Sequence, residues 1–300
     1  MSTVLEAEVR VPSEPPRQPA PYSWWQPALV FLFLGLCYYD VVAALVRDWW
    51  YDDDASHGFV VPLFSLYLLW QRRADLETVP AQPSWSGLVA VASGLSMLIV
   101  GNLGAELFLS RFSLVIVLGG LVVQFFGWPM FRKILFPWAF LFLMIPPPSI
   151  IFNQVTFSLQ LVASQLAKDS LNAIGVPVLL EGNILRLPVM PLEVAEACSG
   201  IRSLISLGVV AIIYGFLLEQ SSWMRLAIAA ASVPLAVAAN AARIVGTGVL
   251  VEYWDPDKAL GFFHGFSGWV VFMIAMGLLM AVHAALRFGA NLATRRSQWA

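Results

Sequence analysis

Long apolar runs are the feature that most constrains what this chain can fold into. Seven are long enough to cross a hydrocarbon core, which takes about 20 residues, and they lie at 27–46, 86–103, 107–127, 132–149, 200–218, 226–250 and 266–287. A shorter run at 58–70 completes a hairpin with the first. Only 12% of the residues are charged, against about 25% in soluble domains. The sequence therefore predicts an all-α polytopic membrane protein with about eight transmembrane helices.

The segment between the fourth and fifth long runs has a different character. Polar residues interrupt 150–175, namely Asn153, Gln154, Gln160, Ser164, Gln165, Lys168, Asp169 and Asn172. This pattern predicts one amphipathic helix that lies against the bundle or in the membrane interface. Prolines, a glycine and short apolar alternations follow in 176–194, which predicts a small outer-face hairpin or loop.

The two ends of the chain are polar. Residues 1–26 are rich in proline and have no apolar core, so we expect a disordered cytoplasmic tail. This tail lacks the layout of a signal peptide, and the first apolar run is therefore expected to remain in the mature protein. Residues 27–288 are expected to form a single multipass membrane domain, and 289–300 a basic cytoplasmic tail.

Basic residues give the expected orientation. If the N-terminal tail is cytoplasmic and 150–175 does not cross, the cytoplasmic side holds Arg10, Arg17, Arg72, Arg73, Arg132, Lys133, Arg225, Arg287, Arg295 and Arg296. The opposite side then holds only Arg47, Arg111, Lys168, Arg186 and Lys258. This asymmetry follows the rule that cytoplasmic loops carry the excess of Lys and Arg. Both tails are therefore predicted to be cytoplasmic.

A thiol stands where the run at 200–218 begins. Cys198 is followed by Gly200 and, four residues on, by Arg202. The positive end of a helix dipole and a nearby Arg both favour thiolate over thiol, so Cys198 is a candidate nucleophile. The alternative is that Cys198 is a small buried residue, since free Cys is among the most buried types. The other cysteine, Cys37, is far away in the chain, so no disulfide framework is indicated.

Two further polar groups are expected on the same outer face. Arg243 follows Asn240 inside an apolar run, where a charge costs roughly 2.5 to 3.5 kcal/mol on insertion scales. His264 precedes the last run, among aromatic residues. With Cys198 these make three chemically capable groups from three segments. The alternatives are that Arg243 or Arg202 snorkels to the interface and that His264 belongs to the aromatic belt.

A second polar island lies before the short run. It contains Asp52, Asp53 and Asp54, followed by His57, and a metal site is one interpretation. The preferred interpretation is a solvated outer loop, because adjacent aspartates alone make a poor cage for a cation. We expect no metal and no cofactor. The scattered basic residues give no indication of a nucleic-acid partner.

These motifs together resemble the exosortase/archaeosortase family. The resemblance is carried by Ala197–Arg202, Asn240–Arg243, His264–Gly265 and, in the N-terminal part, Ser56, His57, Gly58, Pro62, Trp70, Arg72 and Arg73. It covers roughly residues 35–287. It implies a multipass cysteine transpeptidase of the bacterial inner membrane, with its active site facing the periplasm. Its implied partners are membrane lipids, exported proteins with a C-terminal sorting signal of the PEP-CTERM type, and proteins of exopolysaccharide biosynthesis.

The resemblance also implies roles for residues. Cys198 corresponds to the nucleophile, Arg243 to the essential arginine and His264 to the third catalytic member. Chemistry agrees with this assignment, because a thiolate can form a thioacyl intermediate while a histidine moves protons and an arginine stabilises an oxyanion. Substrate contacts are expected from Arg202, Glu196, Asn240 and His57.

Two other classes of protein remain open from the residues alone. A transporter or flippase for a lipid-linked sugar would use Arg243 and Arg202 to bind phosphate, with 150–175 lining the path. The chain shows no pair of related halves, which disfavours that interpretation. A membrane glycosyltransferase or lipid phosphatase would need several carboxylates or a cluster of cations at the active face, and of the acidic residues in the outer loops only Asp52–Asp54 cluster.

Overall fold

The computed structural model describes residues 25–194, 200–254 and 262–297. The chain divides into two compact units, residues 1–40 and residues 41–300, and the boundary lies within the first helix. All of the packing described below belongs to the second unit. The domain boundaries expected from the sequence remain predictions.

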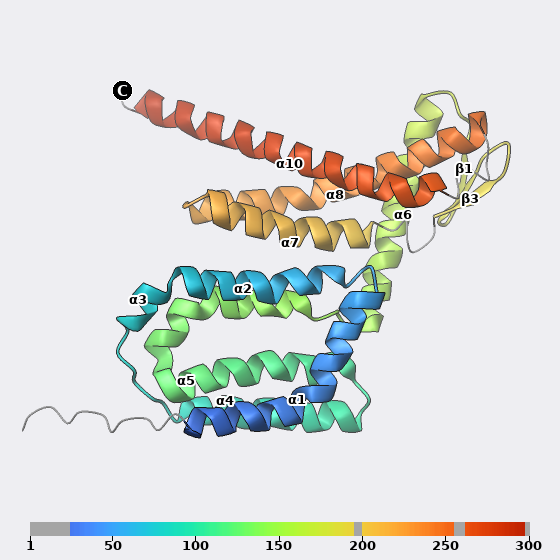
Figure 1. Cartoon of the computed structure of the whole chain (residues 1–300). Helices are drawn as coiled ribbons and strands as arrows, with labels where there is room; N and C mark the ends of the chain where they lie inside the picture. Colours follow the sequence, from blue (N-terminus) through green and yellow to red (C-terminus); the bar gives the residue numbers. More distant parts are fainter. Residues whose placement is uncertain (1–24, 195–199, 255–261, 298–300) are drawn as a thin grey trace, which may run out of the picture. The chain divides into compact units, whose positions relative to one another are not determined.

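Helices make up most of the described chain (Figure 1). In chain order they are α1 Trp25–Tyr51, η1 Ser56–Phe59, α2 Val60–Gln71, α3 Arg73–Glu77, α4 Ser86–Leu103, α5 Leu107–Phe140, η2 Leu141–Met144, α6 Ser149–Ala173, α7 Ile201–Leu218, α8 Ser222–Tyr253 and α10 Phe262–Ser297. The η elements are single turns of 3-10 helix.

Seven helical segments in the described part of the chain are long and apolar enough to cross a membrane. They are Ala28–Tyr51, Ser86–Leu103, Leu107–Met144, Ser149–Ala173, Ile201–Leu218, Ser222–Tyr253 and Phe266–Leu292. Large apolar side chains on their outer surfaces are exposed, for example Val89 at 70% and Ile99 at 59%. Such a surface suits lipid rather than water. The prediction of a polytopic all-α membrane protein is confirmed.

One of these segments contains two of the predicted runs. Gly127 interrupts α5 with a left-handed backbone, φ +82°, and the carbonyl of Gln82 occupies the space that a Cβ would need. The amide of Gln82 donates to the carbonyl of Phe126 at 3.0 Å. The chain therefore breaks between the runs predicted at 107–127 and 132–149. The short run at 58–70 forms α2, a helix of 12 residues.

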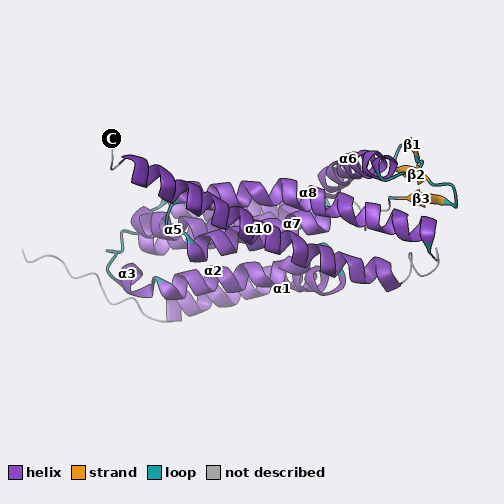
Figure 2. Cartoon of the chain, turned by 90° about the horizontal axis from the view of Figure 1, so that it is seen from above, coloured by secondary structure: helices purple, strands orange, loops and turns teal. Residues whose placement is uncertain are grey.

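Helices α7 and α8 form an antiparallel pair that α10 covers (Figure 2). Gly215, late in α7, faces the backbone of Arg225, early in α8, and Gly208 faces Ser232. Their shared core is rich in small residues and consists of Leu207, Ala211, Ile228, Ala236, Ala239, Ala275 and Leu279. Small side chains let membrane helices approach closely. This packing fixes which ends of α7 and α8 meet.

A small antiparallel sheet follows α6. Its strands are β1 Leu179–Glu181, β2 Ile184–Arg186 and β3 Pro191–Glu193, in the order β1-β2-β3. Leu185 pairs with Leu180 on one side and with Leu192 on the other. Buried Leu185 and Leu192 share a core with Leu171 of α6 and Ile244 of α8. The predicted hairpin is thus present, with a third strand added.

Helix α6 contacts α8 and, to a lesser extent, α7. It lies crosswise to these two helices in Figure 1 and is seen nearly end-on in Figure 2. Its buried face carries Thr156, Gln160 and Ser164, one helical turn apart. If α7 and α8 cross the membrane, a helix with this course would lie along a membrane surface, as the sequence analysis predicts. By length and composition α6 could also cross the membrane, so its predicted place at the membrane surface stays a prediction.

Candidate active site

The first turn of α7 is built around Gly200. This residue caps the helix in the left-handed region, with φ +81°, and its carbonyl accepts a hydrogen bond from the amide of Leu204 at 2.8 Å. A Cβ on Gly200 would lie 2.8 Å from Cγ of Asn240. Asn240 is itself buried, at 2% exposure. Glycine is therefore required both for the backbone angle and for the close approach of α8.

Arg243 lies one turn further along α8 and is partly buried. Its Nε donates to Oγ of Ser267 in α10 at 3.2 Å. Gly268 lies beside the same guanidinium, since a Cβ there would be 3.6 Å from Cζ of Arg243. The backbone carbonyl of Arg243 accepts from Oγ1 of Thr247 at 3.0 Å. The side chain is thus held between α8 and α10.

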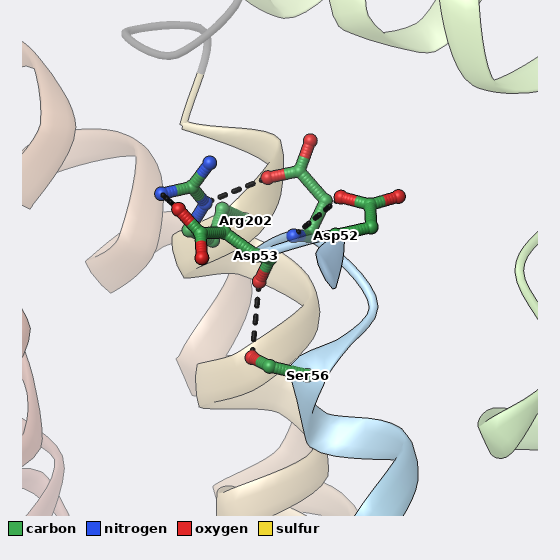
Figure 3. Close-up of polar contacts among 5 residues, drawn as sticks. Asp52, Asp53, Ser56 and Arg202 are labelled. Atoms are coloured by element: carbon green, nitrogen blue, oxygen red, sulfur yellow. Dashed lines mark hydrogen bonds and ion pairs between the residues drawn. The ribbon is translucent and has the colours of Figure 1, made fainter. Parts of the chain in front are cut away.

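Arg202 forms two ion pairs with the loop between α1 and α2 (Figure 3). Its Nε lies 2.7 Å from Oδ1 of Asp54 and its Nη1 lies 3.2 Å from Oδ2 of Asp53. The loop supports these carboxylates internally. Oγ of Ser56 donates to the carbonyl of Asp53 at 3.0 Å, and the amide of Asp54 donates to Oδ1 of Asp52 at 2.9 Å. The acidic run is therefore the counter-ion of Arg202.

His57 is anchored to a different element. Its Nε2 lies 3.1 Å from the carbonyl of Leu143 in η2, while its Nδ1 is buried without a hydrogen-bond partner. Burial lowers the pKa of His57 below its ordinary value of 6.5, and this effect outweighs the raising influence of the Leu143 carbonyl and of Asp52 and Asp54. The ring is therefore neutral at pH 7, with the proton on Nε2 facing Leu143.

Three predicted site residues, Cys198, Glu196 and His264, are described only in part or not at all. Cys198 and Glu196 lie outside the described residues. The backbone of His264 is in the first turn of α10, and its side chain is not among those described. His264 precedes Ser267 by three positions in that helix. The structure shows two contacts in this region, one between Gly200 and Asn240 and one between Arg243 and Ser267. The position of the Cys198 thiol stays a prediction.

Across the described residues, no group of three or more His, Cys, Asp or Glu side chains could hold a metal ion. The model of the transmembrane exosortases matches residues 49–281. The chain belongs to this exosortase family. Membership supports a membrane transpeptidase in general and agrees with the multipass helical fold. No curated protein and no solved structure matches the chain.

The exosortase match includes residues that sequence reasoning did not assign to the site. The sequence predicts that Asp53 and Asp54 belong to a solvated loop, and it indicates no role for Ser267. A signal was available for the aspartates, because an arginine near an apolar run needs a partner. Asp52–Asp54 is the one acidic run predicted on the same face. Ser267 gives no such signal, because a serine near a helix start has many possible partners.

Proposed function

We propose that this exosortase is a cysteine transpeptidase that cleaves C-terminal sorting signals, of the PEP-CTERM type, at the outer face of the inner membrane. One observation carries the proposal. Two of the sequence blocks that resemble the family meet where Gly200 packs on Asn240, and Arg243 of the second block bonds to Ser267, two residues after the third block. Cys198, Arg243 and His264 each stand in one of these blocks.

The reaction has two acyl-transfer steps. The thiolate of Cys198 adds to a substrate peptide carbonyl, the C–N bond breaks, and His264 gives a proton to the departing amine. A nucleophile of the acceptor then attacks the thioester, passes its proton to His264 and releases the thiolate. The acyl group thus moves from the sorting helix to the acceptor. The link to exopolysaccharide production rests on the family resemblance.

Arg243 is proposed to stabilise the oxyanion of both tetrahedral intermediates. Preorganised donors are most effective there when they do not have to reorient during the reaction. The contacts with Ser267 and Gly268 restrict the guanidinium in this way. Glu196 precedes Cys198 by two residues in the sequence, and Asn240 faces Gly200; we assign both, with Arg202 and His57, to substrate contacts.

The positive charge of Arg202 is partly neutralised by neighbouring carboxylates, which the sequence alone does not indicate. Asp53 and Asp54 already pair with it, so an acidic group of the substrate would share this arginine with two aspartates. The same pairing weakens the flippase alternative, which needs Arg202 as a phosphate ligand. It also lowers the field that Arg202 exerts on its surroundings.

The test is mass spectrometry of a sorting-signal protein co-expressed with the wild type, Cys198→Ala, Cys198→Ser or Cys37→Ala. We expect cleavage near the C-terminal helix with the wild type and with Cys37→Ala, because Cys37 is exposed and outside the motif blocks. No cleavage is expected with either Cys198 variant. The mass added to the new C-terminus would identify the acceptor. Cleavage by Cys198→Ala would overturn the proposal.

A further inference from the structure

Two arginines converge on one aromatic ring at the end of α7 opposite to Arg202. Cζ of Arg225 lies 4.1 Å from the centroid of the Phe216 ring, and Cζ of Arg72 lies 5.5 Å from it. Arg72 joins α2 to α3, whereas Arg225 is in the first turn of α8. The position of Phe216 is 14 residues from Arg202, which is about 21 Å along a helix. The two features are therefore separate.

The ring itself is fixed by aromatic packing. Phe136 of α5 stacks on Phe216 with centroids 4.3 Å apart and planes 10° apart, and Phe64 of α2 contacts it edge-on at 6.3 Å. The ring is thus part of the contact among α2, α5 and α7. The two guanidinium groups lie at the rim of that contact, each attracted by the ring quadrupole.

Neither guanidinium has an acidic partner among the described residues. In this part of the chain the carboxylate of Glu219 forms an ion pair with Arg287 at 3.2 Å and a hydrogen bond with Nε2 of His283 at 2.7 Å. Arg225 donates from Nε only to the backbone carbonyl of Glu219, at 2.7 Å. Two cations thus approach the same ring, and no carboxylate in the described part of the chain forms an ion pair with either of them. Such an arrangement attracts an anion.

The surroundings indicate what kind of anion. Exposed apolar and aromatic side chains stand within two residues of Arg72, Phe216 or Arg225 in the sequence, namely Trp70 at 62%, Leu217 at 51%, Leu218 at 54%, Trp223 at 73% and Leu226 at 60% exposure. Tryptophan prefers the level of lipid headgroups, and leucine the acyl region. A ligand that fits both parts has an anionic head and an apolar body.

We infer that Arg72 and Arg225 bind the phosphate of an anionic phospholipid at the rim of Phe216. The planar guanidinium fork matches phosphate oxygens. The Cζ atoms of Arg225 and Arg72 lie 4.1 Å and 5.5 Å from one ring centroid, so both guanidiniums border the same ring. In the predicted orientation this site faces the inner leaflet, where anionic lipids attract basic segments. The lipid would join the end of α2 to the α7–α8 turn.

Native mass spectrometry of the detergent-purified chain tests this inference. The probes are phosphatidylglycerol, phosphatidylcholine with the same acyl chains, and inorganic phosphate alone. We expect phosphatidylglycerol to remain bound, and Arg72→Gln/Arg225→Gln to lower its apparent affinity at least about tenfold. Binding of inorganic phosphate as strong as that of the lipid would contradict a lipid site.

The matched control is Arg132→Gln/Lys133→Gln. It removes the same charge from two exposed residues that are predicted to lie on the same membrane face. We expect less than about a twofold change, because a general surface field is screened and spread over many groups. An equal loss in both double variants would mean that the lipid senses net charge only, and the site would be rejected.

A second measurement remains informative if the Arg72/Arg225 variant does not fold. Phosphatidylglycerol with a photoreactive headgroup, added to the wild type, should crosslink to peptides that contain residues 70–73 or 219–226. The single variants Arg72→Lys and Arg225→Lys keep the charge but lose the fork, and each should weaken binding several-fold. Crosslinks confined to other helix ends would also overturn the inference.

Discussion

Gly200 shows how one residue can set the start of the candidate site. Its φ of +81° and its contact with Asn240 are independent reasons for glycine. Cys198 therefore stands, in the sequence, two residues before a position where only hydrogen fits. A site built in this way is sensitive to one methyl group.

Gly200→Ala is expected to destabilise the fold and to reduce processing. An L-residue in the left-handed region costs roughly 1 to 2 kcal/mol, and the contact with Asn240 adds to this cost. The matched control is Gly208→Ala in the same helix, where the nearest atom to a Cβ is Oγ of Ser232 at 3.9 Å. Alanine is favoured there by roughly 0.5 to 1 kcal/mol. Thermal unfolding in detergent should separate the variants; equal midpoints would contradict the explanation.

His57 gives a prediction with a defined sign. Because burial lowers the pKa of this ring below 6.5, the unfolded chain binds a proton at a higher pH than the folded chain does. The stability that the neutral ring contributes is therefore present above pH 6.5 and is lost as the pH falls through the lowered value. The unfolding midpoint of the wild type should fall between pH 7 and pH 5 by more than that of His57→Gln. Identical pH profiles would show that His57 does not titrate in this way.

At the scale of elements, α7 is tied to other parts of the chain at both ends. Its first turn holds the α1–α2 loop through Arg202. After its last turn, Glu219 pairs with His283 of α10, and His283 also bonds to Tyr214 at 2.9 Å. A helix fixed at both ends can hold its N-terminal turn in one position, which the proposed chemistry requires.

The pairs of Arg202 should contribute unequally. The Asp54 side chain is 28% exposed and that of Asp53 is 78% exposed, so solvent screens the second pair more. Asp54→Asn is expected to cost up to about 1 kcal/mol and Asp53→Asn only a few tenths. In the background of Arg202→Gln, Asp54→Asn should cost much less, and this double-mutant cycle isolates the pair. Additive effects would mean that the contact contributes no coupling.

Sequence periodicity and hydropathy predict elements far better than they predict contacts. The run at 86–103 coincides with α4, and the run at 200–218 begins one residue before α7. In contrast, the pairing of Arg202 with Asp54 joins positions 148 apart. No local pattern encodes such a separation, because it depends on how α1, α2 and α7 pack. The break at Gly127 could be suspected from Gly127 and Pro129 but not assigned a backbone angle.

At the scale of the whole molecule, the two ends of α7 lie beside charged groups of opposite sign. One end has carboxylates paired with Arg202, and the other has Arg72 and Arg225 beside Phe216. The excess of basic residues at the second end is the pattern of a cytoplasmic face. The proposed active site and the proposed lipid site would then lie on opposite membrane surfaces, so that chemistry and inner-leaflet anchoring do not compete.

Single-cysteine labelling tests this orientation. In a background with Cys37→Ala and Cys198→Ala, Ser56→Cys and Ser221→Cys each add a thiol at an exposed position near opposite ends of α7. In intact cells with a permeable outer membrane, a membrane-impermeant maleimide should label Ser56→Cys, because the α1–α2 loop is predicted to be periplasmic. Ser221→Cys should react only after the inner membrane is opened, since the α7–α8 turn is predicted to be cytoplasmic. The reverse pattern would place the proposed active site in the cytoplasm, where an exported substrate could not reach it.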